Sequence, residues 1–327
     1  MDKILSFVVA AVLAGTPLLF GTLGEILTEK SGNLNLGVEG MMFMGGVAGL
    51  AGSYYYEQAA ANPNPVVSVL IAMVCAILCA AFGALIYSVL TITLRANQNV
   101  TGLALTIFGT GFANFLGEAI GNTAPSRYMA VGNVTKDAFN AGIPVLQDLP
   151  VAGRLLFSYN FMVYLGIAVA IVLAWFLGRS RAGLNLRSVG ESPATADAAG
   201  INVTLYKYLA TCVGGGICGL GGLYIVMNSA NGVGGVWVHN CVGGKGWIAV
   251  ALVIFATWSP ARALLGSLVF GALSVMRLYV ALGIPAQIYD IFPYIATVIV
   301  LVAVSMRRKR ENQPPQSLGL AYFREER

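Results

Sequence analysis

Residues 66–94, VVSVLIAMVCAILCAAFGALIYSVLTITL, contain no charged side chain. A helix of about 20 apolar residues crosses the hydrocarbon core of a bilayer, so this segment is long enough to cross it at a tilt. The composition of the chain agrees with this: 57% of its 327 residues are hydrophobic and 10% are charged. In soluble domains about 25% of the residues are charged. The sequence therefore predicts an integral membrane protein and excludes an ordinary soluble domain.

Further apolar segments lie on both sides of this one. We predict an all-α, polytopic transmembrane helical bundle of about nine helices, some of them short, with residues 1–306 as one membrane domain. The first segment begins like a signal peptide, but its apolar run continues to Ile26, so we expect a retained span. Residues 307–327 form a basic, polar tail that we expect to be disordered. The other apolar segments are residues 4–26, 34–54, 99–121, 155–178, 208–228, 247–258, 263–282 and 291–306.

The distribution of lysine and arginine predicts the orientation of these spans. Short loops on the cytoplasmic side of a membrane are enriched in these residues. We therefore expect a cell-membrane protein with the N-terminus and the long connection 122–154 outside, and with the 179–207 loop and the tail in the cytoplasm. If the spans alternate in direction, 13 of the 19 basic residues fall on one side, in the loops 27–35, 91–98, 179–207 and 259–262 and in the tail.

Two Gly-rich segments, residues 21–49 and 214–235, lie one in each half of the chain. In transporters, helices that are interrupted at such segments expose backbone groups to a central cavity, and paired interruptions hint at an internal repeat. A carboxylate within a span is costly and is a functional candidate; for Glu39 the alternative is a bond to neighbouring backbone or a place at the interface. Our candidates for the substrate pathway are Asn33, Asn35, Glu39 and Asn228.

The polar segment 178–207, GRSRAGLNLRSVGESPATADAAGINVTLYK, separates two apolar blocks and contains a short helix signature. Ser192 suits the N-cap, Pro193 the first helical position and Gly200 a left-handed position after the helix. The small residues between them favour a helix of about 10 Å, which is too short to span a bilayer. We predict a docking helix whose contact residues are Ser192, Pro193, Ala194, Ala198, Ala199 and Gly200.

The sequence lacks the patterns of a catalytic, metal or nucleotide site. No G-x-x-x-x-G-K-[ST] motif occurs, so ATP would have to be bound by another subunit. Gly214-x-Gly216-x-x-Gly219 matches a dinucleotide fingerprint, but it lies within an apolar span, and we interpret it as close helix packing. The five cysteines lie mostly in apolar runs and His239 is the single histidine, which argues against a metal site. The basic residues lie in short loops and the tail, so they do not indicate nucleic-acid binding.

Two stretches give the chain a family resemblance. GTLGEILTEKSGNLNLGVEGMMFMGG (21–46) resembles the signature of ABC importer permeases of the simple-sugar and nucleoside class, within the wider group of ribose and branched-chain amino acid permeases. GLNLRSVGESPATADAAGINV (183–203) resembles the cytoplasmic coupling loop of the same permeases. The chain is most similar to the shorter permease of nucleoside importers that use a basic-membrane-protein-type receptor. Sugar members have a Gly-Gly-Ile-Asp-Leu-Ser-like sequence where this chain has Gly32-Asn-Leu-Asn-Leu-Gly, which favours nucleosides.

This resemblance implies a permease subunit that forms the translocation pathway for nucleosides and has no ATPase site of its own. It implies a heterodimer with a second homologous permease, two ATP-binding cassette ATPase subunits that bind the ATP, and an extracytoplasmic substrate-binding lipoprotein. The predicted docking helix would then be the coupling helix that fits a groove of the ATPase. A permease of the same class for a simple sugar is the alternative.

Two further classes were weighed from the residues alone. An ion-coupled secondary transporter would need intramembrane charges, and Glu39 is the chief one in this chain. A membrane enzyme would need a nucleophile with its base or a metal constellation, and the sequence offers neither. We therefore expect a transporter subunit that is not an enzyme.

Overall fold

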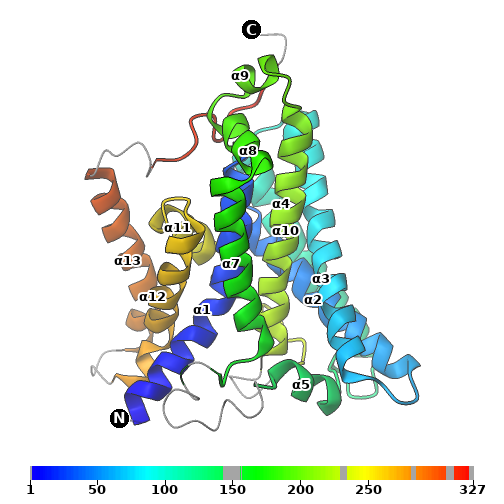
Figure 1. Ribbon diagram of the computed structural model, residues 1–327. Coiled ribbons are helices and arrows are strands. Elements are labelled where there is room, and N and C mark those ends of the chain that lie inside the picture. The colour runs from blue at the N-terminus through cyan, green and yellow to red at the C-terminus, as the bar shows by residue number, and fades with distance from the viewer. Residues whose placement is uncertain are drawn as a thin grey trace.

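The computed structural model describes residues 2–142, 155, 157–228, 234–280, 285–306 and 313–323. Within them the chain forms twelve α-helices and one five-residue π-helix, and it has no β-strand there (Figure 1). The predicted all-α, polytopic membrane bundle is confirmed. Six described helices have the length and hydropathy of membrane spans: α1 (Asp2–Glu29), α3 (Pro65–Ser88, continued by the π-helix Val89–Thr93), α4 (Gln98–Thr123), α7 (Phe161–Arg179), α10 (Val203–Met227) and α12 (Pro260–Tyr279).

The predicted apolar segments match the helices of the structure. Each of the nine segments falls on one helix, but some of the ends differ. Helix α7 begins at Phe161 rather than near residue 155, because the side chain of Asn160 caps it by accepting from the Val163 N–H. The helices that complete the nine are α2 (Val38–Ala59), α11 (Lys245–Phe255) and α13 (Ala286–Met306), and those outside the apolar segments are α5 (Asn133–Asn140), α8 (Arg181–Glu191) and α9 (Pro193–Ala198).

Helix α10 packs against α1, α2 and α3, and its glycines allow direct backbone contact (Figure 1). A Cβ on Gly214 would lie 2.5 Å from the Gly24 oxygen of α1, and a Cβ on Gly45 of α2 would lie 2.3 Å from the Gly219 Cα. The interpretation of the Gly214–Gly219 motif as close helix packing is therefore confirmed. Helix α10 is continuous through these glycines and ends at Met227. Residues 229–233 of the predicted interruption lie outside the described residues.

The loops gather at two opposite ends of the bundle, which we call the α9 end and the α5 end (Figure 1). The α9 end contains α8, α9, the turn between α11 and α12, and the α1–α2 link, which is residues 30–37. The α5 end contains α5, the N-terminal turns of α1, and the α10–α11 loop, which is residues 234–244 in its described part. Ala130 and Val236 form an isolated antiparallel bridge between two segments of this end. This is the grouping of loops that alternating spans predict.

The described part of the tail, residues 313–323, packs on the α9 end. The Ser317 hydroxyl donates to the Gly190 oxygen of α8 at 2.5 Å, and the Gly319 N–H donates to the Gly32 oxygen at 3.2 Å. The prediction of a disordered tail is wrong for these residues, because backbone acceptors of α8 and the α1–α2 link hold them in place.

Candidate functional site

The predicted docking helix is present as α9. It begins after Ser192 and is followed by Gly200, which has a φ of +82°. The Ile201 N–H donates to the Ala196 oxygen at 3.0 Å, which is part of the Schellman arrangement that ends a helix at a glycine. The Ser192 hydroxyl caps no backbone N–H; it lies 2.8 Å from the Thr195 hydroxyl instead. Local capping rules therefore place the helix correctly but not this side chain.

One face of α9 is buried and the other is exposed. Ala196 is 1% exposed and packs with Val189 of α8 and Val203 of α10. Of the six predicted docking residues, Ser192 and Pro193 are half-buried. The exposed face consists of small side chains, which permit the close approach of another backbone. Its residues are Ala194, Thr195, Ala198, Ala199 and Gly200.

Helix α8 rests on the α1–α2 link at Gly190. A Cβ at this position would lie 2.3 Å from the Lys30 oxygen, so the two backbones are in contact. Across from it, Gly32 has a φ of +87°, a conformation that glycine adopts without strain. A displacement of α8 must therefore move the link or break the contact between Gly190 and the Lys30 oxygen. At the same place, burial lowers the pKa of the Lys30 ammonium, and the nearby Arg187 guanidinium lowers it further.

The α1–α2 link continues into the bundle as non-helical chain. Its backbone groups bond to side chains: the Leu34 N–H donates to Gln98 Oε1 at 2.7 Å, and the Tyr87 hydroxyl donates to the Leu34 oxygen at 2.6 Å. The Thr106 hydroxyl donates to the Leu36 oxygen at 2.9 Å. Non-helical backbone at membrane depth needs such partners, because lipid offers none.

Two buried carboxylates at the end of α1 hold neighbouring turns. The Asn35 N–H of the link donates to Glu25 Oε1 at 3.0 Å. The indole N–H of Trp258, in the turn between α11 and α12, donates to the Glu29 carboxylate. Glu25 is 0% exposed and Glu29 is 3% exposed. The end of α1 therefore fixes both the link and that turn.

Glu39, in the first turn of α2, joins α2 to α11. The Gly244 N–H donates to its Oε1 at 2.7 Å, and the Gly246 N–H donates to its Oε2 at 2.5 Å. The first N–H groups of a helix lack partners within the helix and favour a carboxylate. A Cβ on Gly21 of α1 would lie 2.8 Å from the Ala249 Cβ of α11 and 3.6 Å from Val38 of α2, so the two helix N-termini meet inside the bundle. This geometry matches the alternative weighed for Glu39, a bond to backbone.

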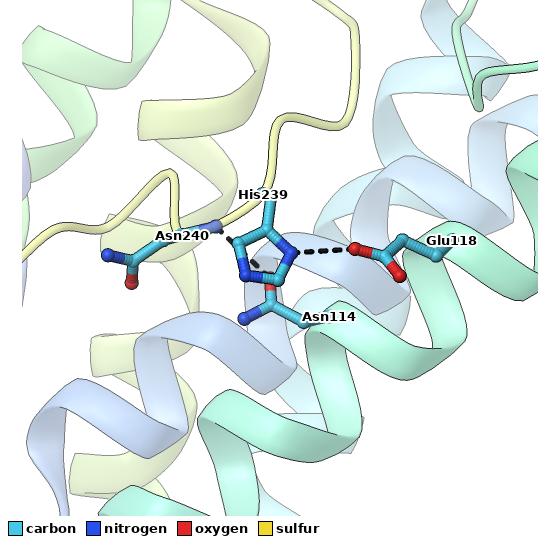
Figure 2. Close-up of polar contacts among 4 residues, drawn as sticks. All are labelled: Asn114, Glu118, His239 and Asn240. Carbon is cyan, nitrogen blue, oxygen red and sulfur yellow. Dashed lines mark hydrogen bonds and ion pairs between the residues drawn. The ribbon is translucent and has the colours of Figure 1, made fainter.

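The α10–α11 loop bonds to α4 at the α5 end, as Figure 2 shows. His239 Nδ1 lies 2.6 Å from Glu118 Oε1, and their side chains are 66% and 58% exposed. Next to this pair, the Asn240 N–H donates to Asn114 Oδ1 at 3.1 Å. The outer part of the loop therefore bonds to the exposed Glu118 and the half-buried Asn114, whereas its inner part bonds to the buried Glu39.

A cavity of about 810 Å³ lies between α1, α10 and α12, toward the α5 end. Asn228, the residue that follows α10, lines it together with Tyr224, Lys245 and Arg277. Its volume is within the range of pockets that hold small organic ligands. Its lining offers hydrogen-bonding groups and positive charge on an otherwise apolar wall.

Comparison with known proteins gives the family. Residues 7–301 match the family described as branched-chain amino acid transport system / permease component. The chain belongs to this permease family. Its relatives include the putative glucose ABC transporter permease protein TsgC13 of Haloferax volcanii, which is 33% identical over 97% of each chain. The guanosine ABC transporter permease protein NupQ of Bacillus subtilis is 31% identical over 99% of each chain. The nucleoside ABC transporter permease protein NupC of Lactococcus lactis subsp. cremoris is 32% identical over 91% of this chain and 92% of its own.

Two of these organisms have a second permease that is also similar to this one. They are the guanosine permease NupP of B. subtilis and the glucose permease TsgB13 of H. volcanii, each 25% identical and each covered over 79% of its length. The relatives are permease subunits of ABC transporters rather than enzymes. The permease is a multi-pass protein of the cell membrane.

The four predicted pathway residues of the permease lie in different places. Asn228 lines the cavity at the α5 end, and Asn33 lines a second pocket at the α9 end. Asn35 and Glu39 are 1% and 5% exposed and bond to neighbouring chain. Glu25 and Glu29 were not singled out as a site from the sequence, although a carboxylate in an apolar segment is the signal that could have found them.

Proposed function

We propose that this chain is a permease subunit of an ATP-binding cassette importer and that it forms part of the translocation pathway for nucleosides. The observation that supports this best is α9. It is a short, capped helix with an exposed face of small residues, placed at the end of the bundle where the basic loops gather. In a family of transport permeases, such an element suits docking on an energy-supplying subunit.

Helix α9 acts as the coupling helix in this proposal, and the α9 end faces the cytoplasm. The exposed residues Ala194, Ala198, Ala199 and Gly200 contact the ATPase, while the buried Ala196 keeps α9 attached to α8. Closure of the ATPase pair displaces α8, and the contact of Gly190 with Lys30 passes this displacement to the α1–α2 link. The link then moves the helices whose N-termini meet at Glu39.

The substrate class is favoured by the relatives and by one motif. Three of the relatives named above are nucleoside or guanosine permeases, and two are glucose permeases, one of them named as putative. The segment 32–37 has Asn-Leu-Asn after its glycine, whereas sugar members have a Gly-Gly-Ile-Asp-Leu-Ser-like sequence at this place. The cavity with Asn228, Lys245 and Arg277 is the proposed outer part of the pathway. A simple sugar is the second candidate, and the two glucose permeases among the relatives are the observation that favours it.

The proposed partners follow from the same resemblance. The relatives TsgC13 and TsgB13, like NupQ and NupP, are two different permeases in one organism. A heterodimer with a second permease is therefore proposed here, together with two ATPase subunits and an extracytoplasmic lipoprotein that delivers the substrate. The chain has no P-loop motif, so the partners bind and hydrolyse the ATP, and the chain itself is not an enzyme.

Uptake in reconstituted vesicles tests this proposal. The chain is co-expressed with its neighbouring permease, ATPase and receptor genes, purified as a complex and placed in proteoliposomes. We expect uptake of labelled guanosine, and this uptake should require both the receptor and ATP on the ATPase side. Excess glucose should not reduce it. Uptake of glucose but not of guanosine would select the sugar alternative. Uptake by this chain alone, driven by a sodium or proton gradient, would refute the ABC assignment.

A further inference from the structure

A second pocket, of about 540 Å³, lies at the α9 end beside the proposed coupling helix, and Gly200 and Asn33 are among its lining residues. It lies between the N-terminus of α10, the residues that follow α9, the turn after α3 and the tail. Two cationic residues, Lys207 and Arg95, line it, and Asp197 is the one acidic residue among the lining residues that the structure describes. The Asp197 carboxylate accepts a hydrogen bond from the Tyr322 hydroxyl at 2.8 Å, so part of its negative charge is already engaged.

Lys207 is the residue that distinguishes this pocket. It is 3% exposed, and within the described part of the chain its ammonium has neither a hydrogen-bond acceptor nor an ion-pair partner. A buried charge of this kind is costly unless an opposite charge or several acceptors reach it. Lys207 lines the pocket, so a ligand in the pocket can supply acceptors to its ammonium.

A further set of polar groups at the pocket lacks partners in the described chain. Helix α10 has 25 residues, and its Asn202 side chain accepts only from the Leu205 N–H. The first N–H groups of α10 thus remain available beside Lys207, at the helix end that favours anions.

Arg95 is held at the rim of the pocket. It has a left-handed backbone with a φ of 56°, and its guanidinium lies 4.5 Å from the centre of the Phe323 ring. The tail therefore holds the Arg95 side chain, and Arg95 and Lys207 line the same pocket. A planar guanidinium and a compact ammonium together suit a phosphate group.

We propose that this pocket binds the phosphate group of a small anionic solute at the α9 end of the protein. Lys207 donates to the phosphate oxygens from the bottom of the pocket, the N–H groups at the start of α10 donate from one side, and Arg95 donates from the rim. The volume leaves room for more than a phosphate ion, so a phosphorylated metabolite fits this site. The proposal is independent of which solute the permease transports.

Equilibrium dialysis of the full chain against radiolabelled inorganic phosphate tests this site. We expect saturable binding to the wild-type protein in detergent, and binding that is weaker by about tenfold or more in Lys207→Met, since that variant loses a charge-assisted hydrogen bond. Lys207→Arg should restore most of the binding. Arg179→Met is the matched control, because Arg179 is exposed at the same end but lies outside the pocket, and it should bind like the wild type.

A second set of measurements separates the sources of the phosphate group. If Lys207→Met is not monodisperse, Arg95→Gln gives the comparison, with an expected weakening of about threefold or more. A bound phosphatidylglycerol that is detected by native mass spectrometry in the wild type and lost in Lys207→Met or Arg95→Gln would support the site and identify a lipid as its ligand. The proposal is overturned if neither phosphate nor phosphatidylglycerol binds, or if both bind equally to the wild type and to these variants.

Discussion

The α1–α2 link and the α10–α11 loop both lead the chain to a helix that begins inside the bundle, but they are held in different ways. The link bonds to buried side chains of α1, α3 and α4, among them Glu25, Tyr87 and Thr106. The loop bonds to exposed or half-buried side chains of α4, such as Glu118, to backbone oxygens such as that of Met129, and to a buried carboxylate where it reaches Glu39. Water can replace a partner at the rim but not in the interior. The cost of removing a partner should therefore fall from the inside outward.

Glu39→Ala should have the largest effect on stability, because Glu39 lies where the link and the loop meet. The substitution leaves the Gly244 and Gly246 N–H groups without an acceptor inside the bundle, at a cost of about 3 kcal/mol or more. We expect a large fall in the thermal unfolding temperature in detergent. Glu39→Gln keeps one acceptor oxygen and should unfold at an intermediate temperature. A wild-type unfolding temperature for Glu39→Ala would contradict this account of the junction.

Gly190→Ala should be the next most costly change, since it separates α8 from the α1–α2 link. The new Cβ would lie 2.3 Å from the Lys30 oxygen, and overpacking of this kind costs about 1–3 kcal/mol. We also expect a loss of ATP-driven transport in the assembled importer. Gly178→Ala is the matched control, because its Cβ meets nothing within 4 Å, and it should behave like the wild type. Equal unfolding temperatures and equal transport rates of Gly190→Ala and Gly178→Ala would refute a contact between α8 and the link.

Tyr87→Phe removes one hydroxyl from the link and should cost about 1–2 kcal/mol. The Leu34 oxygen loses its donor while the ring and its packing stay in place. Tyr55→Phe is the control, because that side chain is 54% exposed. Thermal unfolding of the two variants side by side gives the measurement, and a Tyr87→Phe protein as stable as Tyr55→Phe would mean that this bond contributes little.

Glu118→Gln should have the smallest effect, below about 1 kcal/mol, because exposed ion pairs contribute little to stability. It weakens the pair with His239 at the outer part of the α10–α11 loop (Figure 2), where both side chains are exposed. The same unfolding assay measures it. A loss as large as that of Glu39→Ala would show that the outer part of the loop is as important as its junction with α2.

Local patterns in the sequence were enough for the apolar helices and for α9, but not for α5 and α8. Apolar segments with at most one charged residue predicted the spans, and Pro193 and Gly200 predicted both ends of the docking helix. These features depend on neighbouring residues, so the sequence states them directly. The Gly-rich pattern of α10 also predicted close packing, although not which helices it would contact.

The contacts that decide the candidate site are between residues far apart in the chain. Glu39 and Gly246 are separated by 207 positions, and Gly190 and Ser317 by 127. No local pattern in the sequence pairs them, because the pairing depends on how the helices pack. For the same reason the sequence left open whether Glu39 faces a cavity or bonds to backbone, whereas the structure gives it two backbone partners. The order of the tail likewise depends on acceptors of distant turns.

The most direct test of the central claim is ATP-driven uptake by the assembled importer with Ala199→Trp. Ala199 is exposed at the end of α9, so a tryptophan there should block the docking of the ATPase without disturbing the bundle. Ala182→Trp, at an exposed position of α8, is the matched control. We predict that Ala199→Trp assembles with its permease partner and transports no guanosine, while Ala182→Trp transports it. Full uptake by Ala199→Trp would contradict the assignment of α9 as the coupling helix.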